Sequence, residues 1–346
     1  MAYTDIDDPT IYFNTKLYTG NATNPTTISG IGFQPDWVWT KLRSGGTEAH
    51  RLCDAVRGVT KDLFSDATDG EATNTIGLKS FNSDGYVIGN SNGYNLNSGT
   101  FVSWNWLASN TTASNTQGDI TSTVSANTTS GFSIVSYTGN NSAGATVGHG
   151  LGAVPKWFIV KRRNASGGWV VYNEALGNTK IIELHDTSAS QTSSAAWNNT
   201  SPSSTTFTLG DYTSTNTSGG TYIAYCFAEK KGYSKFGSYQ GNSSNDGTFV
   251  YTGFRPAFVM IKSSSDSSTW HLADNKRIGY NPLNYRAQPN NSNAEYTGVE
   301  IYSDFLSNGF KLRNTDTDTN GARTYIYMAF AEAPFVTSTG IPTTAR

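Results

Sequence analysis

The chain has 346 residues, of which 14% are charged and 13% aromatic, and its formal net charge is −2. This balance excludes the clustered Lys/Arg excess that neutralises phosphates, so we expect no nucleic-acid partner. The chain has no apolar run long enough to cross a bilayer, so we expect no membrane insertion. Abundant Gly, Ser, Thr and Asn beside the aromatics is typical of β-proteins with many turns.

The two ends of the chain differ from the rest. Residues 1–12 form an acidic, turn-like arm that contains Asp5, Asp7 and Asp8, and residues 336–346 are small, polar and unpatterned. Arms of this composition are usually frayed in isolation and become ordered when a partner captures them. We therefore interpret Asp5, Asp7 and Asp8 as docking groups for a larger assembly.

Between the arms, one pattern occurs three times. Each copy opens with Tyr-x-Gly-Asn, continues to a proline followed six positions later by a lysine, and closes on an aromatic-rich segment. The openings are Tyr18-Thr-Gly-Asn21, Tyr137-Thr-Gly-Asn140 and Tyr239-Gln-Gly-Asn242, and the closings are Phe101 to Trp106, Tyr222 to Phe227 and Tyr325 to Phe330. A period of roughly 100 residues suits one small domain per copy.

Each copy is predicted to be a β-sandwich. The segment after the proline, such as residues 37–41, has apolar residues at both odd and even positions, so both faces of this strand should be covered. The closing segment is large and apolar at one parity and small at the other, which predicts one core face and one closely approached face. With Gly/Asn/Asp turns between short strands, the sequence predicts an all-β chain of three tandem sandwiches of jelly-roll or lectin-like type.

The repeat boundaries follow from these segments. We expect sandwiches at 13–108, 132–230 and 231–335, with residues 109–131 as a flexible linker between the first two. Because few residues separate the second and third copies, these two should be locked together while the first moves.

A candidate metal loop lies near the end of the third copy. Asp316, Asp318 and Asn320 alternate as oxygen ligands before Gly321, as in the first half of a calcium loop. The bidentate carboxylate expected six positions later is replaced by Tyr327 in a strand, so an ordinary polar turn explains the same residues better. We therefore expect no cofactor, with Ca²⁺ at this loop as the alternative.

Candidate binding residues are aromatics outside the predicted core strands. Tyr94, Trp197 and Tyr296 lie among amides and hydroxyls, a combination used by sugar sites and by protein interfaces. For any one of them, a cap on the end of its own sandwich explains the aromatic better. Asp54 and Asp274 occupy matched positions in two copies, and we include them as glycan- or partner-binding candidates. A carbohydrate-active enzyme would need such a carboxylate pair in a deep cleft; no nucleophile elbow, phosphate loop or cysteine pair supports another chemistry, so we expect no enzyme.

The chain also resembles a known group of proteins through four segments. These are Phe33 to Lys41 with Val56-Arg-Gly58, Ser136 to Asn140 with Val147-Gly-His-Gly150, Gly232 to Ser238, and Asp304 to Leu312. They are similar to a family of uncharacterised structural proteins of marine bacteriophages, cyanophages included. The resemblance covers nearly the whole chain. It implies lectin-like β-sandwiches on a virion surface, in a tail fibre, appendage or capsid decoration, and it brings no catalytic motif.

The resemblance also implies partners. We expect other virion proteins and a host-surface glycan, with the Asp5 to Asp8 arm docking on the particle. Because the repeats begin almost at Met1, a compact appendage fits better than a long fibre shaft.

A single sandwich of roughly 100 residues cannot easily cover strands that are apolar on both faces. The surplus face therefore needs another repeat or another subunit, and a homotrimer is our first expectation.

Overall fold

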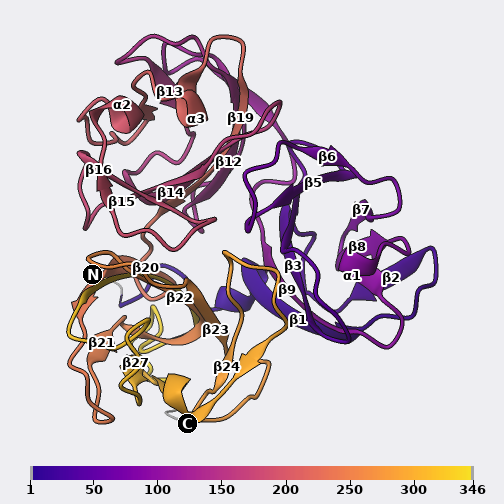
Figure 1. Cartoon of the computed structure of the whole chain (residues 1–346), viewed down its shortest axis with the longest axis vertical. Coiled ribbons are helices and arrows are strands. Elements are labelled where there is room, and N and C mark those ends of the chain that lie inside the picture. The colour runs from indigo at the N-terminus through magenta and orange to yellow at the C-terminus, as the bar shows by residue number, and fades with distance from the viewer. Residues whose placement is uncertain (1–2, 344–346) are drawn as a thin grey trace.

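The computed structural model describes residues 3–343 and consists of antiparallel β-sheets, with 43% strand and 5% helix. The all-β prediction is confirmed, and sandwiched sheets are consistent with the predicted class. Figure 1 shows three lobes around a common centre. We name residues 13–108 lobe 1, residues 109–230 lobe 2 and residues 231–335 lobe 3. Within the described residues, no helix is long and apolar enough to span a membrane.

Lobe 1 follows a short 3-10 helix, η1 (Pro9–Ile11). Its elements are β1 (Phe13–Thr19), β2 (Thr26–Ser29), β3 (Trp37–Ser44), β4 (Arg51–Asp54), β5 (Lys61–Phe64), β6 (Ala72–Thr73), β7 (Leu78–Asn82), β8 (Gly85–Ile88), α1 (Asn92–Asn95) and β9 (Thr100–Trp106).

Lobe 2 contains β10 (Ala113–Asn115), β11 (Ser122–Asn127), β12 (Phe132–Thr138), β13 (Thr146–Gly148), β14 (Pro155–Arg162), β15 (Trp169–Asn173), β16 (Lys180–Glu183), β17 (Gln191–Thr192), α2 (Ser194–Trp197), β18 (Thr206–Thr208), α3 (Thr213–Asn216) and β19 (Thr221–Ala228).

Lobe 3 contains β20 (Ser234–Gln240), β21 (Phe249–Tyr251), β22 (Phe254–Ser263), β23 (His271–Asp274), β24 (Tyr285–Arg286), β25 (Tyr296–Thr297), η2 (Val299–Ile301), β26 (Ser303–Leu306), β27 (Gly309–Leu312) and β28 (Thr324–Pro334).

The large sheets of the three lobes share one strand order. The opening strand pairs with the closing strand, which pairs with the strand after the proline, giving β1-β9-β3-β4, β12-β19-β14-β15 and β20-β28-β22-β23. The prolines sit where a missing backbone donor is tolerated: Pro155 begins β14, and Pro256 lies at a register shift of β22. The repeated sequence pattern therefore corresponds to a repeated pairing pattern.

A smaller sheet lies opposite each large one and encloses a core that belongs to that lobe. The small sheets have the orders β2-β8-β7, β13-β18 and β21-β27-β26. The enclosed clusters include Tyr86 in lobe 1, Phe207 in lobe 2 and Phe310 in lobe 3. Each lobe is thus a small sandwich with its own apolar interior.

The other face of each large sheet points to a core shared by all three lobes. Trp37 of lobe 1 stacks on Tyr225 of lobe 2, with ring centroids 4.3 Å apart. Phe13 stacks on Phe330 of lobe 3 at 5.3 Å, and Phe330 also meets Phe227 at 5.7 Å. Offset and edge-to-face pairs of this kind add to the burial of apolar area. The shared core holds the lobes in the closed arrangement of Figure 1.

This arrangement corrects the roles expected for the two faces of each closing strand, and it removes the physical reason for expecting a homotrimer. The large parity of the closing strands, with Tyr225 and Phe330, makes the contacts between lobes, whereas the small parity, with Cys226 and Ala329, faces the interior of its own lobe. The surplus apolar faces are covered by the other two lobes of the same chain. They therefore provide no physical reason for a homotrimer.

The predicted linker at 109–131 is largely part of lobe 2. β10 pairs with β11, and β11 pairs with β12 in the eight-stranded sheet. Ser122, Ser125 and Ser130 are buried, and the Ser125 hydroxyl accepts a hydrogen bond from Ser109 N. The composition that suggested a flexible linker is that of an edge hairpin with small residues. Lobe 1 also shares the common core, contrary to its expected mobility.

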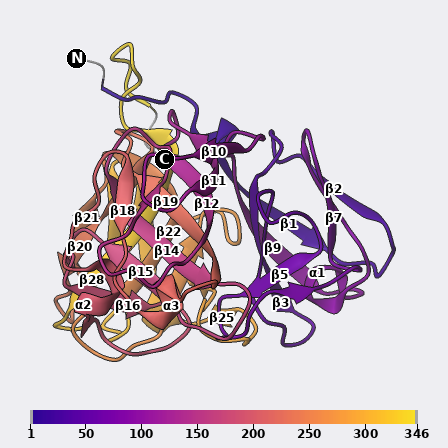
Figure 2. The ribbon, with the colours of Figure 1, turned by 90° about the horizontal axis from the view of Figure 1, so that it is seen from above.

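The acidic N-terminal arm packs on its own chain, which corrects the expectation that it is frayed in isolation, while its docking on a particle stays a prediction. Ile6 is buried in the shared core, and Asp5 N donates to Lys231 O at 3.0 Å. Asp7 accepts bonds from the backbone and hydroxyl of Ser338, and Asp8 accepts from Thr10. The N-terminal arm and the segment after β28 meet at one side of the molecule, where Asp7 contacts Ser338 (Figure 2). The carboxylates predicted to dock on a particle therefore have intramolecular partners.

Candidate functional site

Two of the three predicted binding aromatics are core residues. The Tyr94 side chain is fully buried, and its hydroxyl donates to Asp62 at 2.5 Å. Trp197 is also fully buried, packs on Phe158 at 4.8 Å and donates from Nε1 to Lys180 O. Neither can act as a ligand platform, so the alternative reading, in which each caps its own sandwich, is correct for both. Tyr296, in β25, is 39% exposed.

Asp54 and Asp274 lie inside the molecule and line no cleft. Asp54 Oδ2 accepts from Arg57 Nε at 2.5 Å, and Asp274 Oδ2 accepts from Arg277 Nε at 2.6 Å. All four side chains of these ion pairs are fully buried. The carboxylates thus form matched structural pairs at the ends of β4 and β23, which corrects their assignment as binding residues.

Each of these carboxylates also receives a bond from the neighbouring lobe. The Tyr225 hydroxyl donates to Asp54 at 2.7 Å, and Trp104 Nε1 donates to Asp274 at 3.0 Å. Tyr225 and Trp104 occupy matched positions of the closing strands β19 and β9. The carboxylates therefore join lobe 2 to lobe 1 and lobe 1 to lobe 3.

The third junction has an apolar version of this set. Met328 of β28 takes the position of Tyr225, while Asn173 and Leu176 take the positions of Asp54 and Arg57. Met328 belongs to the shared core and Leu176 packs against it. At this junction, the hydrogen-bond donor of the closing strand and both charges of the buried ion pair are thus replaced together.

The lysine that ends each proline-lysine segment also crosses between lobes. Lys41 Nζ donates to Ser292 O at 3.0 Å, Lys161 Nζ to Thr68 O at 2.8 Å, and Lys262 Nζ to Thr187 O at 3.0 Å. Burial lowers the pKa of each of these lysines to about 8. The three bonds run in a cycle, from lobe 1 to 3, from 2 to 1 and from 3 to 2.

The candidate calcium loop has a different ligand set from the predicted one. Asn320 is buried, and its amide nitrogen donates to Ser244 O and Asn314 O, so it serves the loop and not a metal. His271 comes instead within 4.8 Å of Asp316 and Asp318 through one ligand atom each. Burial raises the pKa of Asp318, but the hydrogen bonds and positive charges around it, from His271, Thr269 and Lys262, together outweigh burial, so the pKa lies below its ordinary value. A histidine with two carboxylates suits a transition metal better than Ca²⁺.

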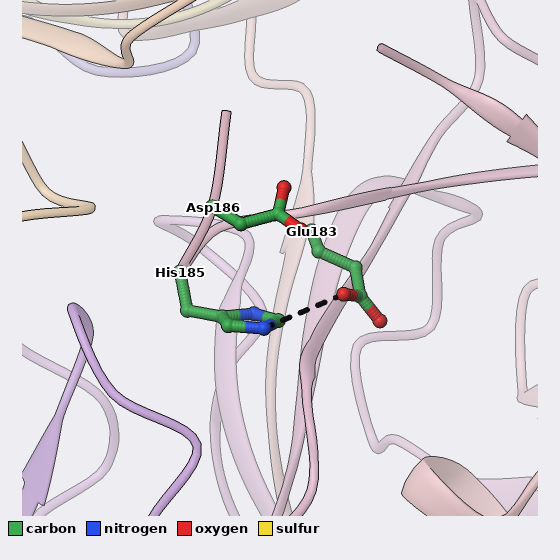
Figure 3. A group of neighbouring side chains, drawn as sticks. All are labelled: Glu183, His185 and Asp186. Carbon is green, nitrogen blue, oxygen red and sulfur yellow. Dashed lines mark ion pairs between the residues drawn. The ribbon is translucent and has the colours of Figure 1, made fainter. Parts of the chain in front are cut away.

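A second group that could hold a metal lies at the end of β16. Glu183, His185 and Asp186 bring one ligand atom each within 4.8 Å, and Figure 3 shows the His185 ring directed at the Glu183 carboxylate. This ion pair measures 3.5 Å. Asp186 accepts from the backbone and hydroxyl of Ser188, and Glu183 accepts from the Tyr212 hydroxyl. These local bonds account for the group without an ion.

A small pocket of about 200 Å³ contains one buried carboxyl, that of Asp36. Burial raises the pKa of Asp36 to about 6, although Ala108 N and Asn110 N donate to its Oδ2. No second acidic side chain lines this pocket within residues 3–343. It therefore lacks the facing pair that glycoside hydrolysis requires.

The larger pocket combines exposed aromatic rings with polar groups. Its volume is about 240 Å³, and it lies where the N-terminal arm, the loop between lobes 2 and 3, and the end of β28 meet. Tyr3 and Tyr251 are each 59% exposed there, and Phe335 is 37% exposed. Glu229 and Lys235 form a 2.7 Å ion pair in its wall. This is the best candidate binding site among the described residues.

Sequence reasoning missed these three aromatics, although one signal was present. In Phe249-Val-Tyr251 the apolar Val250 is buried while Phe249 and Tyr251 are exposed, the period-2 pattern of an edge strand. β21 is indeed the edge of its small sheet. Tyr3 and Phe335 belong to unpatterned ends of the chain, where local sequence gives no such signal.

No curated protein and no solved structure matches the chain. One family does match, over residues 8–334, which takes in all three lobes as a single unit. The chain therefore belongs to the family described as a domain of unknown function, DUF7483.

Proposed function

We propose that the protein is a structural component of a bacteriophage virion surface, in a tail fibre, an appendage or a capsid decoration. Its contacts are with other virion proteins and with a host-surface glycan. The identification of the class rests on the resemblance of the four sequence segments given above. The single structural observation that carries the proposal is the closed body, in which three sandwiches share one core.

The chemistry of the interior supports a structural role. The two carboxylates that motivated an enzymatic alternative are tied to Arg57 and Arg277 and to hydrogen-bond donors of the next lobe. Buried ion pairs with full sets of partners fix one geometry between elements. Rigidity of this kind suits a part that presents a binding surface at a fixed position on a particle.

Mass spectrometry of purified intact virions tests the proposal. We expect peptides from all three lobes in the particle fraction, and immunogold labelling should place them at the tail or on the capsid. Absence of the chain from particles that were washed free of lysate would refute the virion role. Sedimentation velocity of the purified protein separately tests self-association before docking.

A further inference from the structure

We propose that the pocket between Tyr3, Tyr251 and Phe335 binds a single sugar ring of a surface glycan. The inference rests on the proposed function, because it names the ligand class and the site through which a virion protein would meet a host. Three features of the pocket support it, namely its aromatic rings, its polar wall and the fixed positions of the segments that form it.

The rings are exposed in a chain that buries most of its aromatic residues. Tyr3 and Tyr251 keep 59% of their surface in water, whereas the aromatics of the lobe interiors and of the shared core are almost fully buried. An aromatic side chain that stays exposed gives up the favourable free energy of burial. Gathered in one hollow, such rings form flat apolar faces on which the C–H face of a pyranose can stack.

The polar wall matches the hydroxyl edge of the same ligand. The Lys235 ammonium has three N–H donors, one of which bonds to Glu229 at 2.7 Å. The Glu229 carboxylate has several lone pairs beside that bond. Both side chains are part-exposed at the pocket. A sugar offers hydroxyls that donate and accept at once, which fits an ammonium beside a carboxylate.

The pocket is organised before any ligand arrives. The Thr4 hydroxyl, next to Tyr3, donates to Lys231 O at 3.0 Å, and the Lys231 ammonium lies 5.8 Å from the centre of the Tyr3 ring. Phe335 N donates to Gly253 O at 3.2 Å. Preformed positions reduce the entropy lost on binding. A pocket of about 240 Å³ holds one small ring, whereas a protein partner typically covers about 800 Å² per side.

The binding test uses saturation-transfer NMR on the full chain with methyl glycosides of glucose, galactose, N-acetylglucosamine and glucuronic acid. We expect transfer to at least one glycoside, and Tyr251→Ala should weaken its affinity by about tenfold or more. Tyr3→Ala provides a second variant on a separate segment. Tyr280→Ala is the matched control, because Tyr280 is 68% exposed and does not line the pocket.

The outcomes separate this inference from the proposed function. Absence of transfer to all four glycosides, or equal binding by the Tyr251→Ala and Tyr280→Ala proteins, would overturn the sugar site. If Tyr251→Ala removes the chain from assembled virions, the pocket docks a virion protein and the sugar site is again overturned. If the wild-type chain binds a glycoside but is missing from virions, the sugar site stands and the virion role fails.

Discussion

The hydroxyl of Tyr225, in β19 of lobe 2, donates a 2.7 Å hydrogen bond to the carboxylate of Asp54, in β4 of lobe 1. The same carboxylate oxygen accepts from Arg57 Nε. All three residues are buried, so the bond couples two lobes through a charge that water cannot reach. Trp104 and Asp274 repeat this relationship between lobes 1 and 3.

Tyr225→Phe should lower the free energy of unfolding by about 1.5–3 kcal/mol, the usual range for a hydrogen bond to a charged group. The ring keeps its stacking on Trp37, so the change isolates the hydroxyl. Chemical denaturation with a fluorescence readout measures the effect. Tyr280→Phe removes an exposed hydroxyl and should leave stability unchanged; equal effects of the two variants would contradict the coupling.

Arg57→Leu should destabilise the protein by about 3–5 kcal/mol, because it leaves the Asp54 carboxylate buried without its cation. The junction that contains Met328, Asn173 and Leu176 suggests how to compensate. The triple variant Tyr225→Met, Asp54→Asn, Arg57→Leu copies that set and should be more stable than Arg57→Leu alone. A triple variant that is less stable would show that the three positions do not act as one unit.

Local sequence predicted the features that depend on local patterns. Apolar residues at both parities after each proline indicated strands covered on both faces, and β3, β14 and β22 are covered on both. The sequence also predicted Gly/Asn/Asp turns between short strands, and Asp84-Gly85 and Asn308-Gly309 lie at such turns, which join β7 to β8 and β26 to β27. The closed arrangement of the lobes could not be derived in this way, because it depends on contacts between segments that are distant in the sequence, such as that of Trp37 with Tyr225.

The predictions of the candidate sites failed for the same physical reason, which is that contacts between distant segments decide which side chains are buried. Tyr94 and Trp197 stand among polar neighbours in sequence, but Asp62 and Phe158 come to them from other strands and bury them. In the metal loop, the sequence identified Asp316 and Asp318 but could not bring His271 beside them. The exposure of a loop side chain depends on the tertiary structure. Only at Tyr251 did a local sequence pattern, the period-2 alternation of an edge strand, indicate that the side chain is exposed.

Acid should destabilise the protein through buried histidines before most carboxylates titrate. Burial lowers the pKa of His149 to about 4, while the unfolded chain has the ordinary value near 6.5. The unfolded state therefore binds more protons between these values, and stability is full above pH 6.5 and is lost as pH falls towards 4. Burial also lowers the pKa of His50, which adds in the same direction.

His149→Asn tests this pH dependence. The Asn side-chain oxygen can replace Nδ1, which accepts from Leu151 N, but it has no proton to gain. We expect the loss of stability from pH 7 to pH 5 to be smaller in the variant by on the order of 1–2 kcal/mol. Parallel stability curves of the two proteins over this range would contradict the assignment.

A buried asparagine closes the corresponding loop in each lobe. Asn216 donates to Gly210 O and Ser142 O and accepts from Asn140 N, and Asn95 and Asn320 make the matching sets. Asn216→Ala should cost about 2–3 kcal/mol, because it leaves buried backbone groups unpaired. Asn178→Ala, which removes only an exposed hydrogen bond to the Ser201 hydroxyl, should cost under about 0.5 kcal/mol. Thermal unfolding of both variants distinguishes a structural clamp from a general effect of losing an amide.

The docked N-terminal arm can be tested with two isoleucines. Ile6 is 4% exposed and lies in the shared core, whereas Ile11 is 45% exposed. Ile6→Ala should lower the free energy of unfolding by about 2–4 kcal/mol through lost burial and a residual cavity, and Ile11→Ala by much less. The Ile6 variant should also expose the arm to limited proteolysis, because Thr4 and Asp5 hold Lys231 only while the arm lies on the body. Equal stability and equal cleavage of the two variants would mean that the arm contributes nothing to the fold in solution, and Tyr3 would then have no fixed place in the aromatic pocket.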